Sequence, residues 1–232
     1  PVRIEGSMPA YRQVYRTLYG ASGLTGVWAD ENTRDAIFTA FTRKETFATS
    51  GPRIRIRMFA GYNFPNDMTA RSDYARVAYA RGVPQGGVLR RRRAAPELLV
   101  FAIRDPNAAP LQRLQIVKGW LENGSKHEQV YDVACSDGGL VDPDTNRCPD
   151  NGASVDITTC ATNTRVGAAQ LSAIWKDPDY EYANPSFYYA RVIENPTCRW
   201  STWDAIRAGV PPRTGYSATL QERAWTSPIW IR

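Results

Sequence analysis

The single histidine of the chain, His127, is the first candidate for chemistry, because imidazole is the usual general base and a common metal ligand. His127 lies in the segment Ser125–Glu128, with no cysteine nucleophile nearby. The sequence also lacks a serine in a strand–turn–helix elbow, the arrangement that exposes a nucleophilic serine. A multinuclear hydrolytic metal centre needs several nitrogen and carboxylate ligands, which one histidine cannot supply. We therefore expect no catalytic residue, no metal ligand and no cofactor in this chain alone, and we interpret His127 as a surface residue of a hairpin.

Four consecutive arginines, Arg90, Arg91, Arg92 and Arg93, form the densest positive charge in a chain whose formal net charge is +6. They follow a glycine- and proline-rich turn at residues 82–87. Such a run can contact an anionic ligand, or it can be a solvated loop between two elements. No aromatic residue interleaves with the run, as a stacking platform for single-stranded nucleic acid requires. We retain the four arginines as candidate anion-contacting residues and expect no nucleic-acid partner.

The four cysteines are an even set without a Cys-x-x-Cys pair, which indicates two disulfides rather than a zinc ribbon. Disulfides persist in oxidising compartments, so the protein is expected to be periplasmic or secreted. Of the three pairings that four cysteines allow, we favour Cys135–Cys148 with Cys160–Cys198, because the first closes a short polar loop. Each bridge would contribute about 3 kcal/mol by loop-closure entropy.

Aspartates crowd the segment between residues 142 and 156, where oxygen ligands for calcium are conceivable. The spacing of an EF-hand fails, since the glycine at the sixth position and the terminal glutamate are missing, and Pro143 stiffens the loop. We favour a disulfide-stapled polar loop over a calcium site.

Tryptophans gather near the end of the chain, where they could form a sugar-binding platform or pack in the core. The alternation at residues 228–231 fits core packing, which we favour. These tryptophans are Trp200, Trp203, Trp225 and Trp230.

The elements of the first fifty residues follow an α/β pattern. Apolar residues at helical spacing predict a helix over 9–20, and a short apolar run predicts a buried strand within 23–29. A second helix is expected from Thr33 to Lys44, capped by Asn32 or Thr33, with Asp35 in its first turn. Its buried face should consist of Ile37, Phe38 and Phe41.

After Gly51 the pattern changes to that of strands. Residues 53–59 alternate strictly, with Ile54, Ile56 and Met58 on one face and arginines on the other. Five or six strands separated by turns indicate an antiparallel β-sandwich, and two of them should form a hairpin across Asn123-Gly124. The further strands are expected at 98–103, 114–120, 129–134, 187–193 and 228–231.

Non-strand segments interrupt this region. Residues 62–81 should be partly helical, and a helix is expected over 166–176. A last short helix should run from Trp203 to Ala208, capped by Thr202 and closed by Gly209. No apolar stretch approaches the roughly 20 residues that cross a bilayer, so no membrane span is expected.

The chain begins at Pro1 with no initiator methionine and no signal-peptide pattern. We expect it to be the C-terminal part of a larger protein.

Several long motifs resemble one family, the PHP superfamily (polymerase and histidinol phosphatase) of metallohydrolases. More narrowly, they are similar to a bacterial branch of long PHP-like proteins that carries the label of a domain of unknown function and is distantly similar to carbaryl hydrolase. The first two motifs resemble the stretch that leaves the barrel of these proteins, and the likeness extends over nearly the whole chain. The motifs are ENTRDAIF (31–38), RKETFATSGPRI (43–54), LQIVKGW (114–120), YDVACSD (131–137), ENPTCRWSTW (194–203) and AWTSPIW (224–230).

This resemblance implies a parent enzyme with an N-terminal distorted β/α barrel, in which histidines and carboxylates bind zinc, manganese or iron for ester or phosphoester hydrolysis. The family's His-x-His and Asp-x-His ligand motifs are absent here, so no catalytic residue is carried over to this chain.

The resulting expectation is an α+β chain. Residues 1–50 would be the last elements of the barrel, and residues 51–232 a mainly antiparallel β-sandwich domain with short helices and a disulfide-stapled insertion at about 135–165. Its partners would be the upstream barrel and a small anionic ester substrate. The alternative is a non-catalytic, secreted β-sandwich module that binds through the tryptophans or the arginines.

Overall fold

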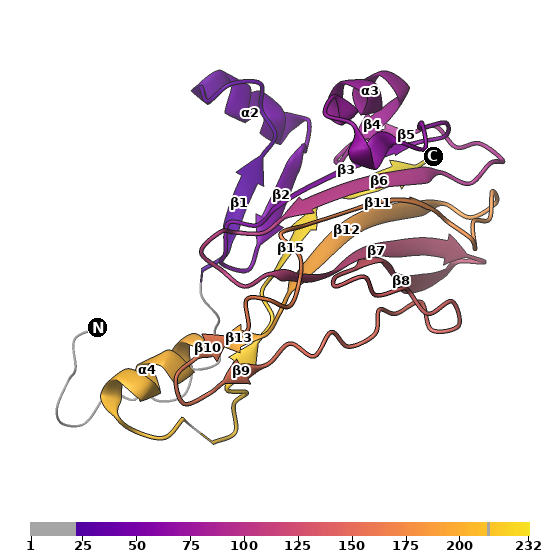
Figure 1. Ribbon diagram of the computed structural model, residues 1–232. Coiled ribbons are helices and arrows are strands. Elements are labelled where there is room, and N and C mark those ends of the chain that lie inside the picture. Colours follow the sequence, from indigo (N-terminus) through magenta and orange to yellow (C-terminus); the bar gives the residue numbers. More distant parts are fainter. Residues whose placement is uncertain (1–21, 213) are drawn as a thin grey trace.

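The computed structural model describes residues 22–212 and 214–232, and its main feature is a pair of β-sheets that pack face to face (Figure 1). The helix expected over residues 9–20 lies outside the described residues. Neighbouring strands in both sheets are antiparallel, except for one parallel pair, β16 with β5. The mainly antiparallel architecture expected from the alternating segments is therefore confirmed.

The larger sheet is built around β12, which pairs with strands from both halves of the chain. Its strands, in spatial order, are β1 (Leu24–Val27), β2 (Thr46–Thr49), β15 (Arg223–Thr226), β12 (Ser186–Glu194), β16 (Ile229–Ile231) and β5 (Val88–Leu89). Two long strands, β7 (Leu111–Glu122) and β8 (Ser125–Cys135), extend from β12, with β7 beside it. The second sheet runs β11 (Gln170–Lys176), β6 (Glu97–Ile103), β3 (Arg55–Gly61) and β4 (Gly82–Pro84).

The remaining elements are short. Two small ribbons are formed by β9 (Val155–Asp156) with β10 (Ala161–Thr162), and by β13 (Thr197–Cys198) with β14 (Thr219–Leu220). The helices are α2 (Arg34–Thr42), the short 3-10 helix η1 (Met68–Ala70), α3 (Tyr74–Arg81) and α4 (Trp200–Ala208). No helix of the described residues is long and apolar enough to cross a membrane.

Alternation along the strands creates the core between the sheets. Ile54, Ile56 and Met58 are fully buried, as predicted, because Ile56 and Met58 project from β3 toward the large sheet and Ile54, just before β3, continues their alternation. Leu114 and Tyr188 are among the side chains that meet them from β7 and β12. Each buried aliphatic or aromatic side chain stabilises the fold by about 1.5–3 kcal/mol relative to its exposed state.

The hairpin of β7 and β8 has the predicted turn. Asn123 and Gly124 both have positive φ, 50° and 80°, which is the backbone of a type I′ turn. This turn matches the right-handed twist of the flanking strands and fixes their register, so that Gly119 faces Glu128 and Trp120 faces His127.

The helix predicted over residues 166–176 is wrong, because Gln170–Lys176 form strand β11. Leu171, Ile174 and Trp175 have helical spacing but also fit a strand. Leu171 and Trp175 pack in the core between the sheets, while Ile174 packs on the opposite face against a second apolar cluster. Pairing with β6 along the whole length of β11 decides the outcome.

Two predicted helices form with corrected details. In α2 the side chain of Thr33 accepts a hydrogen bond from the Ala36 N–H, as expected for an N-cap, but its predicted buried face is wrong, since Phe38 is 70% and Phe41 48% exposed. Helix α4 starts earlier than predicted, after Arg199 rather than Thr202, and ends at Gly209 with φ 65°. The strand at 24–27 is confirmed, although it is not buried: Leu24 is exposed and Val27 half-buried.

The predicted disulfides, Cys135–Cys148 and Cys160–Cys198, both form. The first holds a loop against β8, where the Cys148 N–H donates to a buried carboxylate oxygen of Asp132 over 2.7 Å. The barrel expected for residues 1–50 stays a prediction; β1 and β2, the described strands of that segment, join the large sheet at β15.

Removing the first bridge should cost about 3 kcal/mol of unfolding free energy, because the unfolded chain regains loop entropy and the Asp132 contact loosens. We expect a Cys135→Ser, Cys148→Ser variant to shift the midpoint of urea unfolding accordingly. An unchanged midpoint would show that the loop is held by hydrogen bonds alone.

Candidate anion-binding site

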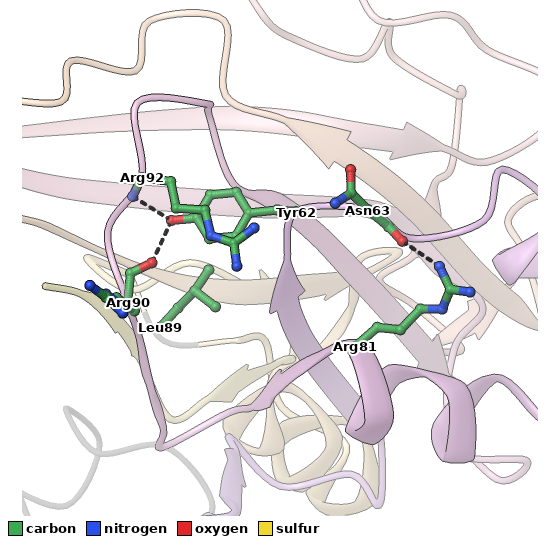
Figure 2. A pocket seen from close by; sticks show the side chains of 6 residues that line it. All are labelled: Tyr62, Asn63, Arg81, Leu89, Arg90 and Arg92. Atoms are coloured by element: carbon green, nitrogen blue, oxygen red, sulfur yellow. Dashed lines mark hydrogen bonds between the residues drawn. The ribbon is translucent and has the colours of Figure 1, made fainter.

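The four arginines connect β5 to the second sheet at one corner of the molecule. Strand β5 pairs in parallel with β16, and the Arg91 N–H donates to the carbonyl oxygen of Arg232 over 2.6 Å. Beside this connection lies a pocket of about 280 Å³ (Figure 2). Its lining residues are Tyr62, Asn63, Arg81, Leu89, Arg90 and Arg92.

Two tyrosines fix the backbone of this loop. The Tyr62 hydroxyl donates to the carbonyl oxygen of Arg90 over 2.8 Å and accepts from the Arg92 N–H over 3.0 Å, as Figure 2 shows. The Tyr180 hydroxyl donates to the Arg92 carbonyl oxygen over 2.8 Å. Burial raises the pKa of Tyr62 and raises that of Tyr180 to about 12, so both hydroxyls keep their protons at neutral pH. The backbone of the arginine run is therefore held in place by hydrogen bonds from two tyrosines.

Aromatic rings also support the guanidinium groups. That of Arg92 lies 4.8 Å from the ring centroid of Tyr62, and those of Arg91 and Arg93 lie 5.1 and 5.4 Å from the ring of Tyr182. Such contacts restrict the side chains without neutralising their charge. Sequence reasoning missed these rings because they come from segments far from the arginines; the tyrosine-rich stretch 180–182 was the available signal.

The positive charge of this corner is not compensated. Across residues 22–212 and 214–232, none of the ion pairs includes Arg81 or the four consecutive arginines. In contrast, Arg57 and Arg113 each pair with a carboxylate. The Arg81 guanidinium donates to the Asn63 carbonyl oxygen over 3.1 Å on the other side of the pocket. The arrangement can bind an anion through charge-assisted hydrogen bonds, and it presents no group suited to proton transfer.

The other sequence candidates lie elsewhere. His127 is an exposed residue of the hairpin, stacked on Trp120 with ring centroids 5.2 Å apart. The Asp142 carboxylate accepts the backbone N–H of Asp144 and of Thr145, which makes a turn rather than a ligand set. In the part of the chain that the structure describes, no three side chains of histidine, cysteine, aspartate or glutamate gather where they could hold a metal ion.

The four C-terminal tryptophans are spread over separate elements. Trp200 and Trp203 belong to α4, Trp225 to β15 and Trp230 to β16. Of these, only Trp203 is exposed, and Trp230 packs against Phe187. They do not form one platform.

Searches of curated proteins and of solved structures return no match. A family model covers the full length of the sequence, residues 1–232. The chain therefore belongs to the family described as a protein of unknown function, DUF3604.

Proposed function

We propose that this chain is the C-terminal portion of a periplasmic or secreted bacterial hydrolase of the PHP superfamily that depends on divalent metals, with the metal centre in an upstream segment. Its own task in this proposal is to bind the anionic part of an ester or phosphoester substrate. The resemblance of its long motifs to that superfamily supports the assignment, and the two disulfides fit an oxidising compartment.

An uncovered apolar face carries the proposal that a further segment packs here. Leu24 is 43%, Phe38 70% and Phe41 48% exposed, all within β1 and α2. Figure 1 shows α2 at the edge of the molecule, standing beyond β1 and β2. Phe38 and Phe41 lie one turn apart on α2, and adjacent exposed apolar side chains of this size mark an interaction surface. An upstream barrel in contact with α2 would cover them.

The arginine pocket supports an anionic substrate. Guanidinium groups bind phosphate, sulfate and carboxylate oxygens with directed hydrogen bonds. The described residues do not fit zinc, manganese or iron, since they offer no ligand cluster. We therefore assign to Arg81, Arg90 and Arg92 the binding of the anionic group, and to no residue of this chain a step in bond cleavage.

The pocket is tested by titrating the chain with inorganic pyrophosphate and following heat or amide chemical shifts. Arg92→Gln should weaken binding about ten- to hundredfold, because one charge-assisted hydrogen bond contributes about 1.5–3 kcal/mol. Arg165→Gln removes the same charge from an exposed position in another loop and should leave the affinity unchanged.

Two outcomes would contradict the proposal. Equal losses in the Arg92 and Arg165 variants would reduce the site to general charge attraction. Hydrolysis of an aryl phosphate by the purified 232-residue chain with added zinc or manganese would place the chemistry in this segment.

A further inference from the structure

A second hollow lies at the turn end of the β7–β8 hairpin, where β12 lies between β7 and β16. Its volume is about 500 Å³, within the range of about 300–1,000 Å³ that small-ligand sites occupy. It shares no lining residue with the arginine pocket. We call it the hairpin groove; its lining residues are Gly119, Trp120, Leu121, Lys126, His127, Glu128, Pro185, Ser186, Phe187, Trp230, Ile231 and Arg232.

The floor of the hairpin groove is aromatic. Phe187 pairs with Gly119 on one side and with Trp230 on the other, and its ring centroid lies 4.9 Å from that of Trp230. A side chain at position 119 would force this ring to move, because a Cβ there would lie 2.4 Å from Phe187 Cζ. The glycine therefore lets the ring lie directly over β7. The ring of Trp120, next along β7, projects from the opposite face of the sheet together with Lys118, so the floor consists of Phe187 and Trp230.

The rim of the groove is exposed and polar. Lys126 and Arg232 contribute permanent positive charges, and the guanidinium of Arg232 lies 5.1 Å from the ring centroid of Trp230. Glu128, opposite Gly119 in the hairpin, contributes a carboxylate. No ion pair of the described residues involves Lys126, Glu128 or Arg232.

We propose that the hairpin groove binds an acidic carbohydrate, a sugar chain that carries carboxylate or sulfate groups. The C–H face of a sugar ring packs on aromatic rings such as Phe187 and Trp230, while Lys126 and Arg232 bind its anionic group. The Glu128 carboxylate accepts hydrogen bonds from sugar hydroxyls. A neutral sugar would leave two cations of the rim without partners. This site does not depend on the proposed hydrolase function.

The test is a titration of the chain with trigalacturonate and, as the neutral match, maltotriose, followed through the indole N–H signal of Trp230. We expect trigalacturonate to bind at least about tenfold more tightly than maltotriose, with the largest indole shift at Trp230. Lys126→Gln and Arg232→Gln, both exposed substitutions, should each bring the two affinities closer by about five- to tenfold. Lys176→Gln, an exposed charge change on β11, should have no effect.

An aromatic variant tests the floor. Trp230→Leu should weaken both sugars, and circular dichroism must show that the variant is folded; Gly119→Ala, which displaces Phe187, is the second variant if it is not. Equal affinity for the acidic and the neutral sugar would overturn the proposal. So would binding of naphthalene-2-sulfonate at the Trp230 indole when trigalacturonate does not bind up to 10 mM or so, since the groove would then select aromatic anions rather than sugars.

Discussion

Replacing Asp177 with asparagine is expected to cost about 3–5 kcal/mol of unfolding free energy, the largest loss we expect from a single substitution. Asp177 and Lys118 are both 3% exposed, and their charged atoms are 2.7 Å apart. Asparagine removes the negative charge without changing the size of the side chain, so the Lys118 ammonium stays buried without its counter-ion. The measurement is urea unfolding followed by tryptophan fluorescence.

Hydrogen bonds around the pair hold the Lys118 ammonium in its buried position. This ammonium also donates to the Asp179 carbonyl oxygen over 2.6 Å, and the Tyr188 hydroxyl donates to Asp177 over 2.5 Å. Burial and the Asp177 charge raise the pKa of Tyr188, so this hydroxyl remains a donor. The network links the β7–β12 pair to the turn after β11.

A matched control is the exposed pair of Asp67 with Arg71. Asp67→Asn should cost at most about 1 kcal/mol, because water already solvates both groups. Adding Lys118→Met to Asp177→Asn should recover much of the loss, since it removes the stranded charge. Equal costs for Asp177→Asn and Asp67→Asn would show that the buried pair is not a significant source of stability.

The strands of this fold were largely predictable, and the reason is local. Strict alternation at Ile54, Ile56 and Met58 needs only a two-residue period, and the Asn123-Gly124 turn specifies its own backbone. Segment 170–176 was ambiguous, because its apolar spacing fits both a helix and a strand. The segment becomes a strand because it pairs with β6. Nothing in the sequence of the segment itself indicates which strand it pairs with.

Features that depend on distant residues could not be predicted. The exposure of Phe38 and Phe41 contradicts an amphipathic interpretation of α2, because nothing among the described residues covers that side. The arginine loop was recognised from its charge, but the tyrosines that hold it come from the residue after β3 and from the turn after β11. Pairing of a buried lysine with Asp177 likewise requires the tertiary structure.

The second large effect concerns Glu194, the last residue of β12. Inward-facing residues of this strand are buried in alternation, and Glu194 continues the series with no exposed surface. Neither of its carboxylate oxygens has a hydrogen-bond partner among the described residues. Burial, followed by the charges of Glu222 and Asp105, raises the pKa of Glu194 to about 8. The carboxyl group is therefore protonated in the folded protein at neutral pH.

This shift makes folding depend on pH. In the unfolded chain the group titrates near 4.5, so its contribution to stability is fully present below that pH and is lost as the pH rises toward about 8. pH 7 lies about 2.5 units above the pKa of this group in the unfolded chain, and each unit is equivalent to about 1.4 kcal/mol. The folded protein is therefore less stable at pH 7 than below pH 4.5 by about 3 kcal/mol. Glu194→Gln does not titrate, and we expect it to be more stable than the parent at pH 7 by up to this amount.

Chemical unfolding of the parent and of Glu194→Gln at pH 4.5 and pH 7 measures the effect. The two proteins should have similar free energies of unfolding at the lower pH, because residue 194 is then neutral in both. At the higher pH the variant should have the larger free energy of unfolding. Glu181→Gln, at an exposed position, should leave the pH profile unchanged. If Glu194→Gln lost stability equally at both pH values, the carboxyl group would have partners that the amide cannot replace. That result would contradict the explanation given for the raised pKa of Glu194, which is burial of its carboxyl group without a hydrogen-bond partner.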